Sequence, residues 1–260
     1  MSSATKTLEL LEYFAPTRPE IGLSQLCRLA SRDKATTYRG LRSLEQTGFV
    51  EQNPITKRYR LGPALLQLAQ TREITVPRKS GAIAPLQTLS QTTSETCHAS
   101  ILSGTTLYKL VSVESPRHSI RVIIDVQTFP LHATASGLCA LAFGPDNLID
   151  TAKSALTTYT ENTVATEDAL LDIIHTARNT GFGFADGSLE SDVHSLAAPL
   201  YDQTGSFAGA VSVATVASRF TPELKQQIKA QLVTASREIS RNWGGTIPAV
   251  IEQSWSAVLT

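Results

Sequence analysis

Cationic and small polar side chains gather at two places within the first 60 residues of this 260-residue chain. At the first place, Asp33 can cap a helix that runs through the segment KATTYRGLRSLEQT and ends at Gly48. The exposed donors expected near the start of this helix are Lys34, Thr36, Thr37 and Arg39. Arg42 follows on the same helix, and Arg32 lies in the turn before it. A helix that enters the major groove of DNA needs such side chains to read base edges and to hold phosphates.

A basic hairpin is predicted directly after this helix. Residues 49–51 and 58–61 are short strand candidates, and residues 53–57 form the turn between them. The hairpin carries Lys57, Arg58 and Arg60. These cations can straddle a phosphate backbone or reach into a minor groove.

Two earlier helices must hold the basic helix in place. Residues 5–14 predict an amphipathic helix with Leu8, Leu11 and Phe14 on its apolar face, and residues 23–30 predict a second short helix. The inner face of the third, basic helix is expected to consist of Tyr38, Leu41 and Leu44. Three helices followed by a basic hairpin predict a winged helix-turn-helix domain. The alternative is a three-helix packing module whose charges serve only solubility, and the charged hairpin favours the DNA-binding interpretation.

The charge of the chain is distributed unevenly, although its formal net charge is zero. Residues 1–80 contain 13 Lys and Arg against 7 Asp and Glu, whereas residues 81–260 contain 10 against 16. The first part therefore carries +6 and the second −6. This asymmetry indicates that one end of the protein meets a polyanion and the other does not.

The rest of the chain predicts a mixed α+β domain with an antiparallel sheet. Strands are expected over residues 97–102, 106–113, 119–126, 182–186, 195–201 and 206–215. Helices are expected over residues 63–75, 82–93, 135–143, 146–156 and 166–180, and from Thr221 to Gly244. The predicted domains are residues 1–62, which bind DNA, a linker helix over 63–80, a second domain over 81–245, and a tail over 246–260 to which the sequence assigns no role.

Several classes of protein are excluded by what the sequence lacks. It contains no apolar run of the ~18 residues that a membrane-spanning helix needs, and no signal peptide is recognised at its start. Three widely spaced cysteines form no disulfide framework, which fits a reducing cytoplasm. The five histidines form no zinc-binding spacing. Ser136 follows His132 closely, but nothing orients a base toward this hydroxyl, so we expect no catalytic residue, no metal and no cofactor.

Two groups of motifs resemble the IclR-type bacterial transcriptional regulators. In the first half, DKATTYRGLRSLEQTGFVEQN followed by RYRLG is similar to the recognition helix and hairpin of that family. In the second half, PLHATASGLCALAF and LAAPLYDQTGSFAGAVSVA are similar to two of its characteristic segments, in the same order. The resemblance covers roughly residues 5–245. The set of residues expected to contact DNA is Arg32, Lys34, Thr36, Thr37, Tyr38, Arg39, Arg42, Lys57, Arg58 and Arg60.

The resemblance implies a GAF-like effector-binding domain in the second half. It also implies a homodimer or tetramer that binds a partly palindromic double-stranded operator, with its affinity set by a small organic acid. Matching the family's ligand-contacting positions residue by residue gives Phe129, Ala135, Ser136, Val193, Ser195, Ser212 and Ala214.

The residues themselves suggest how an acid could be held there. The stretch around Thr134, Ala135 and Ser136 leads into a helix whose first N–H groups can bind an anion. Ser195 and Ser212 could add hydroxyls, and Arg121 a positive charge. Taken singly, each residue fits an ordinary helix cap or strand hydroxyl equally well.

This sequence departs from the family pattern at Ala185, Ser188, Ala214 and Leu138, where members that bind small polar acids have polar or charged residues. Each change makes the expected pocket less polar, which favours a larger or aromatic acid as the effector. The function expected is therefore a ligand-responsive transcriptional regulator, with repression as the expected direction, although the sequence itself does not distinguish repression from activation. The alternative is a metabolite-binding protein or enzyme whose helix-turn-helix serves protein contacts.

Overall fold

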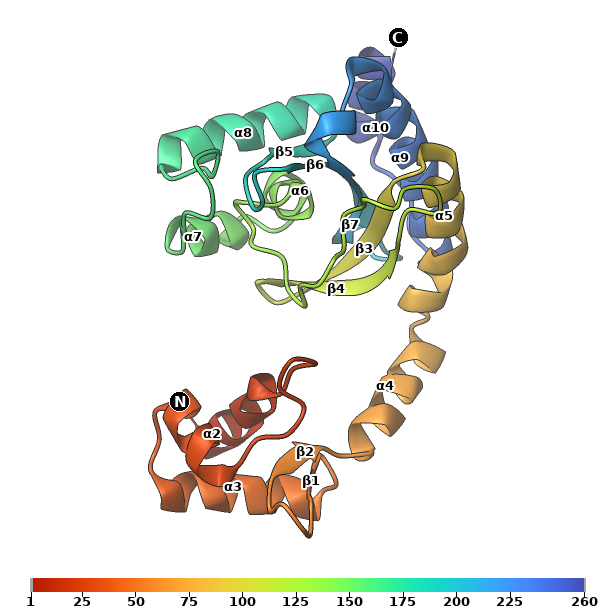
Figure 1. Ribbon diagram of the computed structural model, residues 1–260. Helices are drawn as coiled ribbons and strands as arrows, with labels where there is room; N and C mark the ends of the chain where they lie inside the picture. Colours follow the sequence, from red (N-terminus) through yellow and green to blue (C-terminus); the bar gives the residue numbers. More distant parts are fainter. Residues whose placement is uncertain (1, 260) are drawn as a thin grey trace. The chain divides into compact units, whose positions relative to one another are not determined.

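The computed structural model describes residues 2–259, and the chain divides after Val76 into two compact units (Figure 1). The first unit is drawn in red and orange, and the second in yellow to blue. None of the described helices is long and apolar enough to cross a lipid bilayer.

The first unit is a winged helix-turn-helix. Its elements are α1 (Ser3–Leu8), the 3-10 helix η1 (Glu9–Tyr13), α2 (Leu23–Ala30), α3 (Lys34–Gln46), β1 (Val50–Gln52), β2 (Tyr59–Leu61) and α4 (Ala64–Thr75). The antiparallel β1 and β2 form the wing, with Glu51 opposite Arg60. The core of the unit is built from Leu10, Phe14, Ile21, Leu26, Leu41, Leu44, Val50 and Tyr59. This arrangement confirms the predicted domain type.

The start of the first unit differs from the prediction. The single helix expected over residues 5–14 is instead α1 followed by η1, with the tighter turn beginning at Glu9. The change of helix type rotates the buried face, so Leu10 is buried and Leu8 is 52% exposed. Gly48 ends α3 as predicted, because its φ of +74° lies in the left-handed region that glycine adopts readily.

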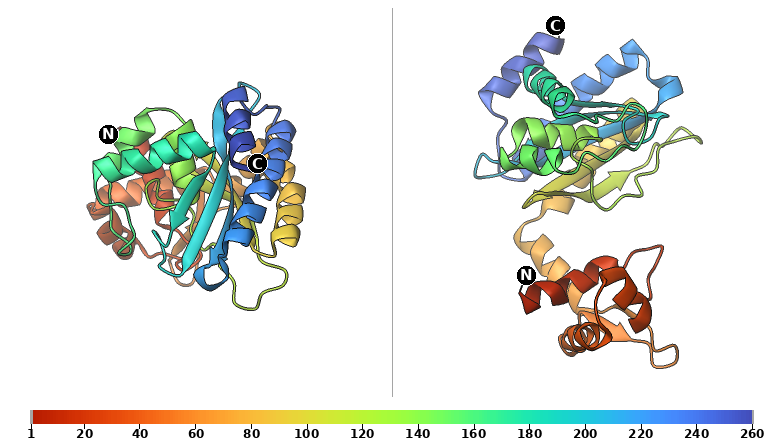
Figure 2. Two further views of the ribbon diagram at one scale, coloured as in Figure 1. Left: turned by 90° about the horizontal axis from the view of Figure 1, so that it is seen from above. Right: turned by 90° about the vertical axis from the view of Figure 1, so that its left-hand side faces the viewer.

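The second unit is a five-stranded antiparallel sheet between two helical layers, in the order β4-β3-β7-β6-β5 (Figure 2). Its strands are β3 (Thr96–Ser103), β4 (Thr106–Val113), β5 (Gly183–Asp186), β6 (Val193–Tyr201) and β7 (Phe207–Val216). Helices α5 (Arg78–Thr93) and α9 (Pro222–Asn242) cover one face. The other face is covered by α6 (Ala135–Phe143), with α7 (Asn147–Lys153) and α8 (Glu167–Thr180) packed against it. A short 3-10 helix, η2 (Ala217–Arg219), follows β7.

The strand expected over residues 119–126 is absent, and this prediction was wrong. Backbone pairing with β4 begins just past this segment, where the Lys109 N–H donates to the Gln127 carbonyl and the Phe129 N–H donates to the Leu107 carbonyl, both at 2.9 Å. Within the segment, the Ile124 carbonyl accepts from the Lys109 ammonium at 2.8 Å. Without a continuous ladder the segment crosses the end of the sheet as irregular chain, with Val122 buried and Ile123 62% exposed. It thereby becomes one wall of a cavity.

Helix α6 packs directly onto the sheet because small residues line its contact. A Cβ atom on Gly183 of β5 would lie 2.2 Å from the Ala135 carbonyl oxygen, and one on Gly137 would lie 2.5 Å from the Leu131 carbonyl oxygen. No side chain larger than hydrogen fits at either position without moving the helix. The Thr134 hydroxyl caps the helix by accepting from the Gly137 N–H at 3.0 Å.

The tail, which the sequence left without a role, forms α10 (Ala249–Leu259) and packs against α8 and α9. Trp255 is fully buried, and its indole N–H donates to the Gly181 carbonyl at 2.8 Å. The ring also lies 6.0 Å from that of Phe182, centroid to centroid. The tail is therefore part of the core of the second unit. Residue 260 of the predicted tail lies outside the described residues.

We predict that Trp255→Ala lowers the free energy of unfolding of the second unit by about 3–5 kcal/mol, since it removes a buried aromatic side chain and leaves a cavity. Urea unfolding followed by circular dichroism would measure the change. Val250→Ala is the matched control, because Val250 lies on the same helix with 67% of its surface exposed, and should change stability by less than about 0.5 kcal/mol. Equal stability of the two variants would show that α10 does not support the unit.

Candidate functional site

Helix α3 presents a cationic face at its N-terminal end. Lys34, Arg39 and Arg42 are exposed, and Lys34 has no ion-pair partner among the residues that the structure describes. Arg42 pairs with Glu45 one turn further on, at 2.8 Å. The carboxylate of Asp33 caps the helix by accepting from the Thr36 N–H at 2.8 Å, and this bond holds the pKa of Asp33 below its ordinary value. The cap fixes the start of the helix and so the placement of the exposed side chains.

Three of the predicted DNA-contacting residues lie differently from what the sequence suggested. Thr37 is only 1% exposed, because its hydroxyl turns back to donate to the Asp33 carbonyl at 2.9 Å. Tyr38, expected on the inner face, is 46% exposed and lies on the cationic face instead. Arg32 pairs with Glu9 and donates to the Lys6 carbonyl, so it fastens the turn to α1 and is not a free cation.

The wing adds further cations and one apolar residue that the sequence did not single out. Lys57, Arg58 and Arg60 are exposed as predicted, and Arg60 pairs across the hairpin with Glu51 at 2.6 Å. Ile55 lies in the turn of the wing and is 89% exposed. An exposed apolar side chain at a wing tip can insert against sugar and base edges in a minor groove. The sequence could have indicated Ile55 through its place in the predicted turn between the two strands, but not through its residue type.

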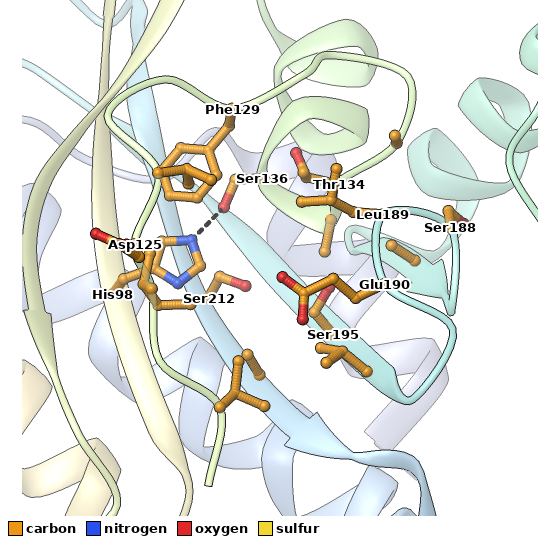
Figure 3. Close-up of a pocket in the computed structure, with 18 of the residues that line it drawn as sticks. His98, Asp125, Phe129, Thr134, Ser136, Ser188, Leu189, Glu190, Ser195 and Ser212 are labelled. Atoms are coloured by element: carbon orange, nitrogen blue, oxygen red, sulfur yellow. Dashed lines mark hydrogen bonds between the residues drawn. The ribbon is translucent and has the colours of Figure 1, made fainter. Parts of the chain in front are cut away.

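The second unit contains a cavity of about 250 Å³, large enough for one small molecule. It lies between the N-terminus of α6, the sheet strands β3, β6 and β7, and the irregular segment before Phe129 (Figure 3). Eight of the nine predicted effector-binding residues line it: Phe129, Thr134, Ala135, Ser136, Val193, Ser195, Ser212 and Ala214. Whether they contact an effector remains a prediction.

Arg121 does not line the cavity, which corrects the expectation of a positive charge there. Its guanidinium pairs with Glu114 at 2.6 Å on the surface of the unit. None of the lining residues is Lys or Arg. An anion in this cavity would therefore depend on hydrogen-bond donors, such as the N–H groups of Ala135 and Ser136 at the start of α6, since that of Gly137 already donates to the Thr134 cap.

The departures from the family pattern have two different locations. Ala185, Ser188 and Ala214 line the cavity, so their small side chains form part of its wall. Leu138 is only 1% exposed and packs in the core of the second unit, outside the lining. The interpretation of Leu138 as a pocket residue was therefore wrong, because α6 turns this position toward the sheet.

His98 is a cavity residue that the sequence reasoning missed. It extends from β3, its Nε2 atom lies 3.0 Å from the Ser136 hydroxyl, and its ring stacks on that of Phe129 with centroids 4.6 Å apart (Figure 3). Its Nδ1 atom is buried and has no hydrogen-bond partner among the described residues. Burial, with a smaller contribution from Lys109, lowers the pKa of His98 to about 3, so the ring is neutral at physiological pH. Only its place in a strand, facing the same side as Ser100, could have drawn attention to it.

Glu190 is the second lining residue that the sequence did not indicate. It belongs to the loop between β5 and β6, and its carboxylate points among the other lining side chains (Figure 3). A carboxylate at this place repels a second negative charge and accepts a hydrogen bond from a hydroxyl or an ammonium group. The cavity thus offers backbone donors at one wall and an acceptor at another.

Two family models match the two units that contain these sites. The IclR helix-turn-helix domain matches residues 3–54, and the bacterial transcriptional regulator IclR C-terminal domain matches residues 78–241. The chain belongs to the IclR family of bacterial transcriptional regulators. As a member of this family it is a DNA-binding regulator with an effector domain, and its relatives are regulators rather than enzymes.

Individual relatives of this IclR-family chain agree in both sequence and structure. A crystal structure described as an IclR transcriptional regulator from a Silicibacter species is 38% identical, with a TM-score of 0.90, and the match covers 96% of this chain and 99% of that one. The HTH-type transcriptional regulator XynR of Escherichia coli is 25% identical over 94% of this chain and 98% of its own length. The 4-hydroxybenzoate complex of an IclR homolog from Microbacterium hydrocarbonoxydans shares the fold, with 21% identity, a TM-score of 0.75 and coverage of 92% of this chain and 100% of that one.

We predict that Arg39→Ala weakens operator binding by about 1–3 kcal/mol, since Arg39 is exposed on the cationic face of α3. Fluorescence anisotropy on an operator recovered by in vitro selection would measure the loss. Arg241→Ala, which removes an exposed cation from the other unit, is the control and should bind DNA as the unaltered protein does. Unchanged affinity in the Arg39 variant would refute the assignment.

A second prediction concerns acid stability. Between pH 6.5 and about 3 the unfolded chain binds a proton at His98 that the folded chain does not bind, so the free energy of unfolding falls as the pH falls through this window. By pH 4.5 this single group removes about 2–3 kcal/mol. Urea unfolding at pH 7 and pH 4.5 should therefore show a smaller drop for His98→Gln than for the unaltered protein. Equal drops would contradict the neutral, buried histidine.

Proposed function

We propose that this protein is an effector-controlled repressor that binds a partly palindromic operator through α3 and the wing. Residues 1–62 bind DNA, residues 63–76 connect, and the second unit, which begins at Pro77, binds the effector. The observation that carries the proposal is that one chain combines an exposed cationic face on α3 with a cavity in a separate unit. Repression is proposed because a repressor has only to occupy the operator and block transcription. It needs no additional surface for contact with other proteins. A protein that acts on DNA in a bacterium works in the cytoplasm.

The effector is proposed to be a small aromatic carboxylic acid. The apolar walls formed by Phe129, Ala185, Val193 and Ala214 favour a flat apolar body. Its carboxylate would accept from the first N–H groups of α6, where the helix dipole also favours negative charge. The family member crystallised with 4-hydroxybenzoate supports this class of ligand.

The opposite end of the effector is proposed to carry a hydroxyl or another donor. Glu190 supports this, since its carboxylate points among the lining side chains and can accept a hydrogen bond from such a group. An acid with a second carboxylate would be repelled at the same place, because no lining residue carries a compensating positive charge. The cavity therefore favours hydroxylated monocarboxylates over dicarboxylates.

Self-association is proposed to involve α4. None of its residues is buried, and Leu66, Leu68 and Ile74 are 75%, 53% and 74% exposed. A helix of 12 residues without a buried face gains little stability from its own chain, which favours packing against the same helix of a second copy. Such a dimer would present two copies of α3 to two operator half-sites.

We predict that Glu190→Gln tightens the binding of benzoate several-fold, because a repelling charge leaves the cavity, and reduces the advantage of 4-hydroxybenzoate over benzoate. Isothermal titration calorimetry with the two acids would measure both effects. Asp192→Asn removes a charge from the same loop outside the lining and should change neither affinity. Identical behaviour of the Glu190 and Asp192 variants would count against the proposed orientation of the ligand.

A further inference from the structure

A second hollow in the same unit lies on the other side of the β5–β6 loop from the cavity described above. It has a volume of about 420 Å³ and lies between α8, β5 and α9. Its apolar floor includes Phe182 and Leu196, which are 2% and 1% exposed, together with Phe184. Ser188 lines both hollows, so the same short loop separates them.

Two lysines on α9 stand over this floor. Lys225 and Lys229 are four residues apart and so lie on the same face of the helix. The Lys225 ammonium lies 4.1 Å from the ring centroid of Phe184, and the Lys229 ammonium lies 5.9 Å from that of Phe182. Neither lysine has an ion-pair partner among the residues that the structure describes.

One carboxylate lies in the lining beside this pair of positive charges. Asp186 is the acidic residue in the lining, and its carboxylate is 2.7 Å from Nδ1 of His194. The hydroxyls of Thr176 and Thr180 on α8 donate within their own helix. Burial, together with the neighbouring Lys225, lowers the pKa of Lys229, which is the expected effect of placing two like charges in a partly closed site. Two like charges four residues apart on a helix repel each other, and an anion bound between them would reduce this repulsion.

We propose that this hollow is a second ligand site, which binds an aromatic carboxylate with its ring on the Phe182, Phe184 and Leu196 floor and its carboxylate between Lys225 and Lys229. Cation–π contacts place both ammonium groups near the floor, and the Lys225 ammonium would move from the face of Phe184 to the ligand carboxylate when the ring binds. The site is distinct from the first cavity, where no lysine or arginine is present and the donors are backbone N–H groups.

The test uses the full-length protein with its eight lysines reductively dimethylated with ¹³C, which preserves their charge. The two lysine signals are assigned with Lys225→Arg and Lys229→Arg. Titration with 2-naphthoate should shift both signals, whereas inorganic phosphate and the neutral 2-naphthalenemethanol should not do so at the same concentration. No shift of these signals at saturating 2-naphthoate would overturn the proposal. An equal shift with phosphate would also overturn it, because it would indicate a site for any anion.

Calorimetry gives an independent measurement. The double variant Lys225→Gln, Lys229→Gln should bind 2-naphthoate at this site at least about tenfold more weakly, since two charge-assisted contacts are lost. Arg241→Gln, which removes a charge from the far end of α9, should bind as the unaltered protein does. Operator affinity without ligand should be the same in all three proteins. A double variant that binds 2-naphthoate with unchanged affinity and stoichiometry would overturn the proposal even if operator control through the first cavity holds.

Discussion

The close packing of α6 on the sheet is the constraint on which the effector unit depends. The Ala135 carbonyl lies so near Gly183 that a methyl group there would be 2.2 Å from it, and a methyl group on Gly137 would be 2.5 Å from the Leu131 carbonyl before the helix. This contact places the N-terminus of α6 at the wall of the cavity and brings Ser136 to 3.0 Å from Nε2 of His98. The N–H groups of α6, the Ser136 hydroxyl and the neutral His98 imidazole therefore lie in one cavity. Their arrangement follows from the close packing of backbone atoms around Gly183 and Gly137, not from charge.

In the DNA-binding unit, too, the placement of the exposed side chains depends on contacts made elsewhere in the unit. The Asp33 cap and the Thr37 hydroxyl bond both satisfy the start of α3, while Arg32 ties the preceding turn to α1. These contacts fix the helix start, and the side chains of Lys34 and Arg39 remain exposed on it. The apolar side chains of α4 are exposed, which is why dimerisation through this helix is proposed.

Sequence reasoning succeeded where a local pattern determines a local structure. Asp33, Gly48, Thr166 and Thr221 marked helix ends correctly because capping depends on neighbouring residues alone. It failed where the outcome depends on contacts between residues that are far apart in the sequence. Nothing local shows that residues 119–126 lack a strand partner, that Arg121 prefers Glu114 to the cavity, or that Trp255 fills a space beside Gly181. His98 and Glu190 were missed because a single polar residue in the sequence does not show which cavity its side chain will line.

The central claim is that occupancy of the α6 cavity and occupancy of the operator are coupled. Reciprocal linkage gives the most direct measurement: the Kd for operator with and without saturating 4-hydroxybenzoate, and the Kd for 4-hydroxybenzoate with and without operator. The account predicts that each ligand weakens the other by the same factor, at least about fivefold. Binding of both ligands with no change in either Kd would contradict it.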